Sequence, residues 1–248
     1  MKKSNISEIF ENDGFIVIKN VLKKSQINNL MNDLDRVKDK VEKKHNQFFH
    51  KTPDNKFNTI HNIQKFHKKG SIIELARNKK IQSICKTLIG KKTMIRNIEF
   101  FLKPKKSGMP SPFHQDNYYW NIINAEATNV WIACSKVSKR NGGICYFKGS
   151  HKLGIIRHEI SNMKGSSQKI SDKIIKNLGF KRVFPKLNPG DCLIHHPEVI
   201  HGSFKNNSNT DRIGFVVSYA STSHKIDKQK LSEYKDKMIQ NLKKIYNN

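Results

Sequence analysis

A series of short apolar runs separated by turns, between Met94 and Tyr219, limits the possible folds of this chain more than any other feature. The runs have the length of β-strands, and the Gly, Pro and Asn residues between them are typical of turns. Many short strands connected in this way indicate a β-sandwich or a β-barrel. In chain order the runs are RNIEFFL, FHQDNYYW, TNVWIAC, GGICYF, DCLIHH, VIHGSF and RIGFVVSY.

Helical patterns lie on both sides of this strand-rich region. Residues 6–22 predict a short helix, a turn at Asp13-Gly14 and a strand at 15–18. Longer helices are expected at residues 25–44, with Ser25 as N-cap, at 71–90, with Gly90 as C-cap, and at 226–246. Two polar stretches remain: residues 45–69, expected to be irregular, and residues 158–180, expected to form a surface insertion or lid.

The formal net charge of +27 raises the question of a polyanionic partner. Only seven of the 47 basic residues are arginine, whereas specific nucleic-acid readers depend on arginine forks. Lysine is instead spread along the whole chain, which favours a lysine-rich solvated surface. We therefore do not expect nucleic acid as a partner.

The four cysteines are far apart and form no CxxC pair, so a cysteine-based zinc or redox site has no support. Widely spaced single cysteines are typical of reduced thiols in a cytosol-like compartment. The first residues, MKKSNISEIFENDGF, lack the apolar segment of a signal peptide, and no run of about 18 apolar residues predicts a transmembrane helix. We expect a cytoplasmic protein without a membrane partner.

Two short motifs carry the candidate chemistry. His114 and Asp116 are two residues apart, so on a strand their side chains project from the same face. His201 lies in VIHGSF, and the turn-rich segment after it leads to a strand that begins at Arg212, which predicts a hairpin with His201 on one arm and Arg212 on the other. Two histidines and one carboxylate form the facial triad of non-haem Fe(II) oxygenases. A buried arginine nearby can grip the far carboxylate of 2-oxoglutarate.

Other residues near these motifs leave alternatives open. His196 competes with His201 as the third ligand; its odd spacing from His201 places it on the opposite face, although Pro197 disturbs that argument. His195 and His151 are interpreted as structural or supporting residues. Strand alternation would place Tyr118 and Trp120 beside the metal, where they are candidate substrate residues.

The motifs together resemble the phytanoyl-CoA hydroxylase (phytanoyl-CoA dioxygenase) family in order and spacing. The matching segments are ENDGFIVIKNVL at 11–22, HQDNYYW from His114, NGGICYFKGSHKLG at 141–154 and PGDCLIHHPEVIHGSFKNNSNTDR at 189–212. One departure is Lys148, where the family usually has proline. The matches are weak at 45–93, at 155–180 and after 222.

The resemblance implies a mainly β fold with flanking helices: a double-stranded β-helix, or cupin-like jelly roll. It implies one domain over residues 1–248, with a helical and strand segment at 1–93, the jelly-roll core at 94–222 and a C-terminal helix at 223–248. It also implies Fe(II) at His114, Asp116 and His201, oxoglutarate bound to Arg212, and Trp131 lining the cofactor site. The retained Asp116 argues against the halogenating relatives, which lack this carboxylate.

The implied activity is hydroxylation of a small-molecule metabolite with O2, with succinate and CO2 as co-products. The lysines and Arg157 within the 155–180 segment favour a polar or anionic substrate over a purely apolar one. Two other hypotheses remain. One is a nucleic-acid-associated basic protein or a dioxygenase acting on a polyanion, and the other is a metal-binding relative without turnover.

Overall fold

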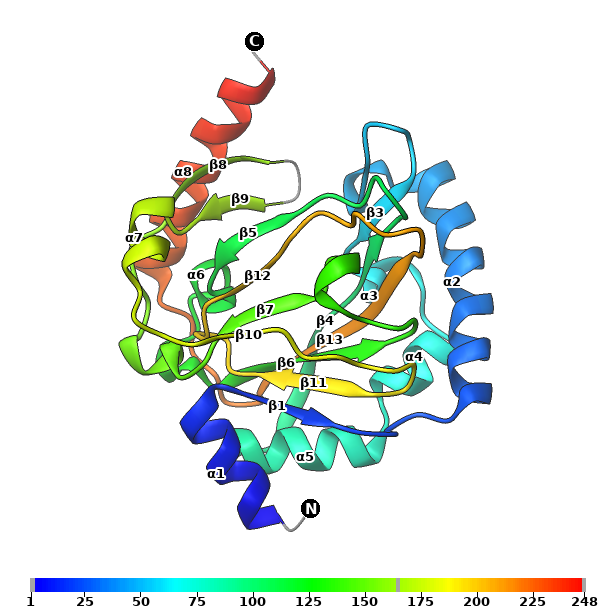
Figure 1. The fold of residues 1–248 in the computed structure, drawn as a ribbon, viewed down its shortest axis with the longest axis horizontal. Helices are drawn as coiled ribbons and strands as arrows, with labels where there is room; N and C mark the ends of the chain where they lie inside the picture. The colour runs from blue at the N-terminus through cyan, green and yellow to red at the C-terminus, as the bar shows by residue number, and fades with distance from the viewer. Residues whose placement is uncertain (1–2, 164–165, 247–248) are drawn as a thin grey trace.

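Two facing antiparallel sheets organise this computed structural model, which describes residues 3–163 and 166–246 (Figure 1). The sheets confirm the predicted jelly roll with flanking helices. The larger sheet contains, in spatial order, β1 (Phe15–Ile18), β11 (Cys192–His195), β6 (Ala127–Ala133), β13 (Arg212–Ser221), β4 (Thr93–Lys103), β3 (Phe57–Ile60) and β2 (Phe49–Lys51). The smaller sheet contains β10 (Arg182–Val183), β7 (Ile144–Phe147), β12 (His201–Ser203) and β5 (Ser111–His114).

The register of β4 against β13 decides which side chains face the smaller sheet. Arg212 pairs with Lys103 and Val216 pairs with Glu99. Side chains alternate along each strand, so the odd-numbered residues 97–103 of β4 share the inner face with the even-numbered residues 212–218 of β13. The intervening residues, among them Phe100 and Phe215, belong to the hydrophobic core on the outer face.

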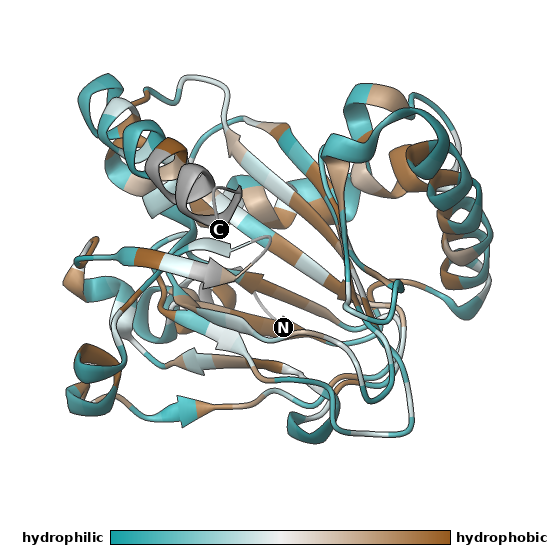
Figure 2. Cartoon of the chain, turned by 90° about the horizontal axis from the view of Figure 1, so that it is seen from above, coloured by the Kyte–Doolittle hydropathy of each residue, from teal (hydrophilic) through white to brown (hydrophobic). Residues whose placement is uncertain are grey.

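Helices cover that outer face. The longest, α2 (Lys24–Lys44), buries one stripe made of Ile27, Leu30, Leu34, Val37 and Val41, and its outward side is polar (Figure 2). Each fully buried aliphatic side chain of this kind contributes roughly 1.5–3 kcal/mol to stability. The other helices of this layer are α1 (Lys3–Asp13), which lies beside β1, and α3 (Ile63–Phe66), α4 (Ser71–Ala76) and α5 (Lys79–Ile89).

Two expectations about this layer need correction. Ser25 is not the N-cap of α2, because the helix begins at Lys24 and the Gln26 side chain accepts a hydrogen bond from the backbone N–H of Lys23 (2.9 Å). Residues 45–69 are not simply irregular, because β2 and β3 form a hairpin that extends the larger sheet beside β4. These strands have only three and four residues, too few to show a recognisable period in the sequence. The helix expected at 71–90 is divided into α4 and α5, and Asn78 is the N-cap of the second. The predicted C-cap is confirmed, since Gly90 ends α5 in the left-handed conformation.

The 158–180 segment forms a small unit outside both main sheets. It contains the two-stranded β8 (Glu159–Met163) and β9 (Ser166–Lys169), followed by α7 (Asp172–Asn177). The C-terminal helix α8 (Lys228–Tyr246) lies against β8 and β9 (Figure 1). This agrees with a surface insertion; the role of a lid stays a prediction, as does the division of the chain into one domain with three parts.

The remaining short elements are α6 (Asp116–Trp120) and the 3-10 turns at Asn46–Phe48, Ile123–Ala125, Lys139–Asn141 and Ser150–Leu153. All four cysteines are buried and none forms a disulfide. Within residues 3–163 and 166–246, no helix combines the length and the apolar character needed to cross a bilayer.

Candidate metal and oxoglutarate site

The smaller sheet brings two distant histidines side by side. His114 ends β5 and His201 begins β12, and the two residues are direct partners in the antiparallel register. Their ring centroids are 4.4 Å apart. This pairing explains how motifs 87 positions apart in the chain, at 114 and 201, can form one site.

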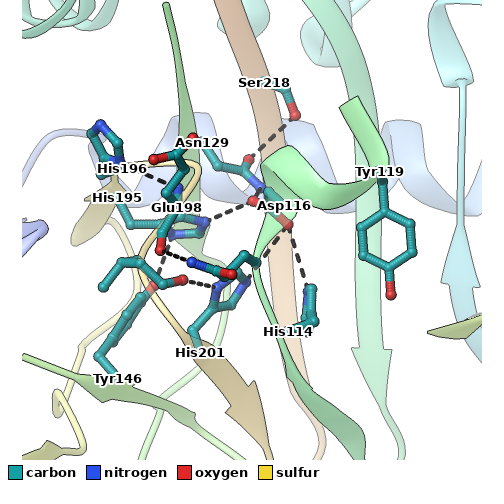
Figure 3. Close-up of polar contacts among 12 residues, drawn as sticks. His114, Asp116, Tyr119, Asn129, Tyr146, His195, His196, Glu198, His201 and Ser218 are labelled. Atoms are coloured by element: carbon teal, nitrogen blue, oxygen red, sulfur yellow. Dashed lines mark hydrogen bonds and ion pairs between the residues drawn. The ribbon is translucent and has the colours of Figure 1, made fainter. Parts of the chain in front are cut away.

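Asp116 lies beside the two histidines, but at the start of a helix and not on the predicted strand. The strand ends at His114, Gln115 is extended, and α6 begins at Asp116. The Asp116 Oδ1 atom lies 3.5 Å from His114 Nε2 and 3.7 Å from His201 Nε2. One ligand atom from each of the three residues lies within 4.8 Å of the others, a cluster able to hold a metal ion. Figure 3 shows the three side chains converging on this point.

Backbone carbonyls fix both imidazoles in the orientation that a metal requires. His114 Nδ1 donates to the carbonyl of Pro112 (2.7 Å), and His201 Nδ1 donates to that of Val199 (3.0 Å). A carbonyl can only accept, so the proton is on Nδ1 and each Nε2 keeps its lone pair toward the cluster. Burial lowers the pKa of His201 to about 3, which also favours the neutral imidazole that binds metals.

The second oxygen of Asp116 is held by a buried hydrogen-bond network. Oδ2 accepts from Asn129 Nδ2 (2.9 Å) and from His195 Nε2 (3.0 Å). The Tyr146 hydroxyl completes the chain at His195 Nδ1 (2.8 Å). Burial opposes ionisation, but the neighbouring His201, His114 and His195 hold the pKa of Asp116 well below its usual range. A carboxylate oriented in this way leaves Oδ1 directed at the two imidazoles.

His196 and His151 lie away from this cluster. The His196 ring contacts His151 and Phe10, with centroid distances of 5.0 and 6.0 Å. His151 Nε2 donates to the carbonyl of Glu11 (3.0 Å). The geometry thus places His201 and not His196 beside His114 and Asp116, while His195 supports Asp116 as expected. The identity of the iron ligands stays a prediction.

Arg212 faces the cluster from the opposite sheet, which corrects the predicted hairpin. His201 and Arg212 begin strands of different sheets, because β12 pairs with β5 and β7 whereas β13 pairs with β4 and β6. The chain crosses from one sheet to the other in the turn-rich segment 204–211. The two residues therefore line one cavity from opposite walls.

The Arg212 guanidinium is buried with few partners. Its side chain is among the largest fully buried ones, and its Cζ lies 5.4 Å from the Trp131 ring centroid. Nη1 donates to the carbonyl of Phe101 (3.3 Å), but Nε has no hydrogen-bond partner among the described residues. Burial lowers the pKa of Arg212, yet a guanidinium keeps its charge in proteins. Burying an unpaired guanidinium costs free energy, so a bound anion would stabilise Arg212.

Lys103 adds a second buried cation that the sequence did not single out. It lies opposite Arg212 in the register, and its Nζ donates to Ser203 Oγ (2.7 Å) and to the Phe204 carbonyl (2.6 Å). Burial, with a smaller contribution from Arg212, lowers the pKa of Lys103 well below its usual value. In the described part of the chain, neither cation pairs with a carboxylate.

Gly214 makes room for the Trp131 side chain. A Cβ at Gly214 would lie 1.9 Å from Trp131 Cζ2, a distance that no packing allows. The strand alternation places Gly214 two residues after Arg212 on the same face. A glycine here lets the indole approach β13 closely, on the same face as the Arg212 guanidinium.

A cavity of about 120 Å³ connects these groups. It lies between the two sheets, and its lining includes the three candidate metal ligands, Arg212, Trp131 and Trp120. Oxoglutarate fits the donor set: a metal cluster at one end and unmatched positive charge at the other.

The two predicted substrate residues have separate positions. Trp120 lines the cavity, whereas Tyr118 stacks on His158 with a centroid distance of 4.0 Å and lines a different hollow of about 450 Å³ beside α8. The helix that begins at Asp116 breaks the strand alternation on which both predictions depended. Tyr119, which the sequence argument passed over, packs edge-on against His114 with centroids 5.7 Å apart (Figure 3).

Comparisons with known proteins concern the family and the fold of the chain. The chain is 25% identical over 235 residues to the peroxisomal phytanoyl-CoA dioxygenase of Homo sapiens, covering 89% of this chain and 69% of that protein. Its fold is similar to that of EctD from S. alaskensis with 2-oxoglutarate and 5-hydroxyectoine (TM-score 0.75, 17% identity, 90% of this chain and 78% of that one).

A second solved structure with this fold is the epimerase SnoN in complex with Fe3+, alpha ketoglutarate and nogalamycin RO (TM-score 0.72, 17% identity, 90% of this chain and 84% of that one). At these identities, both structural likenesses show the fold alone. The model of the phytanoyl-CoA dioxygenase (PhyH) family matches residues 10–214, most of the chain. This match confirms the resemblance and the predicted enzyme class, a dioxygenase class whose cofactors are Fe(II) and 2-oxoglutarate. The chain belongs to the phytanoyl-CoA dioxygenase family.

Proposed function

We propose that this protein is an Fe(II)- and 2-oxoglutarate-dependent dioxygenase that hydroxylates a small molecule. One observation carries the proposal: a His-Asp-His cluster and a buried arginine without an ion-pair partner line the same cavity from opposite sheets. The first arrangement suits Fe(II), and the second suits the far carboxylate of oxoglutarate.

The roles of the side chains follow from their contacts. His114, Asp116 and His201 would hold the metal on one side, which leaves the cavity side open for oxoglutarate, O2 and substrate. Asn129 and His195 would keep Asp116 from turning away, because both bind its second oxygen. When bound, iron and oxoglutarate supply O2 activation, with succinate and CO2 as co-products.

Arg212 and Lys103 would neutralise the distal carboxylate of oxoglutarate. Arg212 offers a planar fork, and the Lys103 charge lies behind Ser203, which lines the cavity. Trp131 would form the flat wall along the oxoglutarate chain, held in place above Gly214. Water exclusion from this buried niche strengthens each of these charge interactions.

Hydroxylation is the finer part of the proposal, since SnoN, with the same fold, is an epimerase. The expectations of an anionic substrate and of a cytoplasmic location also stay predictions. The nucleic-acid alternative gains no support from the family or the fold. The complete cluster together with Arg212 favours turnover over simple metal binding.

Anaerobic reconstitution tests the proposal directly. We expect the protein to bind one Fe(II), and oxoglutarate added afterwards to produce a visible charge-transfer band, because bidentate chelation requires the open positions of a three-ligand site. Admission of O2 with a suitable substrate should then release succinate. Iron and oxoglutarate that give neither a band nor heat in calorimetry would refute the assignment.

A further inference from the structure

One acidic side chain lies in the cavity wall apart from the metal cluster. Glu99 is on the inner face of β4, and with Asp116 it accounts for the carboxylates that line the cavity in the described residues. Its side chain is 15% exposed, so it is largely removed from bulk water. Neither metal binding nor oxoglutarate binding gives this group a role.

Glu99 is held in a fixed orientation. His61 Nδ1 donates to Glu99 Oε1 (2.7 Å), and the His61 ring packs edge-on against Phe101 and His50. Within residues 3–163 and 166–246, no hydrogen bond engages the other oxygen, Oε2. A carboxylate fixed through one oxygen presents the other as a ready acceptor for a bound ligand.

The surroundings of Glu99 suit an organic cation. Phe101 and Trp120 line the same cavity, and aromatic rings stabilise ammonium groups by cation–π contact. Asn97, two residues before Glu99 on the same strand face, offers a further polar group. Arg96 stacks on Trp120 (4.6 Å to the ring centroid) and does not line the cavity.

Acidic residues are scarce in this chain, which makes the inward position of Glu99 notable. With 47 basic and only 20 acidic residues, lysine dominates its polar positions. A glutamate at an inward position of the larger sheet, opposite Val216, is an exception to this lysine-rich composition. A carboxylate near a bound dianion is unfavourable unless positive charge compensates it. His61 supplies such charge only when it is protonated, and Arg96 interacts electrostatically with Glu99, so a cationic group of the ligand would add to their contribution.

We propose that the substrate of this enzyme carries a protonated amine and that Glu99 binds it. The inference rests on the proposed function, since it concerns the same cavity. It replaces the anionic preference expected from the surface lysines with a requirement for a cationic nitrogen inside the cavity. A zwitterion would satisfy both the surface field and Glu99.

The test uses three probes of matched size on the anaerobic enzyme loaded with Fe(II) and oxoglutarate: n-butylamine, n-butanol and butyrate. Calorimetry at near-neutral pH and fixed ionic strength gives their affinities. We expect the wild type to bind the amine roughly 10- to 100-fold more tightly than the alcohol, as expected for a charge-assisted hydrogen bond. Glu99→Gln should remove this advantage, and Glu99→Arg should make butyrate the preferred probe.

Glu233→Gln is the matched control, because it removes one negative charge from α8 without touching the cavity. It should leave the amine advantage unchanged. Equal affinities for amine and alcohol, an advantage that survives Glu99→Gln, or absence of heat from all three probes would each overturn the inference. The charge-transfer band keeps the two proposals apart: if it never forms, the proposed function fails, and if it forms while the probes fail, only the substrate class is wrong.

Discussion

The two sheets supply opposite halves of the site and hold them in different ways. The smaller sheet provides His114 and His201, whose outer nitrogens bond to carbonyls two residues away. The larger sheet provides Arg212, Lys103 and Glu99, whose positions depend on the pairing of β4 with β13. In the metal half, which contains His114 and His201, local contacts fix the orientation of the imidazoles. The placement of this half, and of the anion half with Arg212, Lys103 and Glu99, depends on pairing between distant strands.

Substitutions in the two halves should therefore lower different ligand affinities. A substitution at His114 or His201 removes a ligand and leaves the opposite wall intact, because the two walls belong to separate sheets. A substitution at Asp116 also removes a hydrogen-bond partner of Asn129 and His195 in the larger sheet. A substitution in the anion half removes charge or shape from the central strands of the larger sheet. We thus expect metal affinity and oxoglutarate affinity to be separable by mutation.

The largest expected effect is in the metal half. His114→Ala, Asp116→Ala and His201→Ala should each abolish Fe(II) binding and oxoglutarate decarboxylation, because each removes one of three convergent ligand atoms. His196→Ala is the matched control and should retain both, since its ring lies against Phe10 and His151. Anaerobic iron calorimetry and succinate release measure the two properties, with thermal melting to verify folding. A folded, inactive His196 variant beside an active His201 variant would reassign the third ligand.

The next effect is in the anion half. Arg212→Ala should weaken oxoglutarate binding by roughly 2–5 kcal/mol, the range for truncating one partner of a buried charge pair. Fe(II) affinity should change far less, because Arg212 lies on the opposite wall from the ligands. Arg212→Lys should lose less, since it keeps the charge but not the fork. Calorimetric titrations of both ligands decide the matter, and unchanged oxoglutarate affinity would place the carboxylate anchor elsewhere.

The sequence identified the residues of the metal half correctly, although the local structure expected for them was partly wrong. The HxD spacing and the later VIHGSF segment identified three residues that do converge. The reasoning from strand alternation was wrong, because a helix begins at Asp116. That helix has five residues, too few to show a helical period, so Tyr118 was placed in the cavity and Tyr119 was missed.

The anion half was predictable only in part. Arg212 stood out through its spacing from His201, but the turn-rich segment between them suits a hairpin and a crossover between sheets equally well. Lys103 and Glu99 carried no signal, because the inward position of each follows only from its register with Arg212 or Val216. Pairing between strands 109 positions apart, as for 103 and 212, follows from tertiary packing, which local sequence patterns do not encode.

The smallest expected effect concerns the close contact between Gly214 and Trp131 in the larger sheet. Gly214→Ala would place a Cβ 1.9 Å from the indole, so the ring or β13 must shift. Overpacking of this kind costs roughly 1–3 kcal/mol of stability, and displacement of Trp131 from below Arg212 should weaken oxoglutarate binding as well. Gly179→Ala is the matched control, because nothing lies within 4 Å of its Cβ position, and it should change stability by less than about 0.5 kcal/mol. Urea unfolding and oxoglutarate calorimetry on both variants give the comparison; a Gly214 variant as stable as the Gly179 variant, with unchanged oxoglutarate affinity, would show that the close approach of glycine and indole is not required.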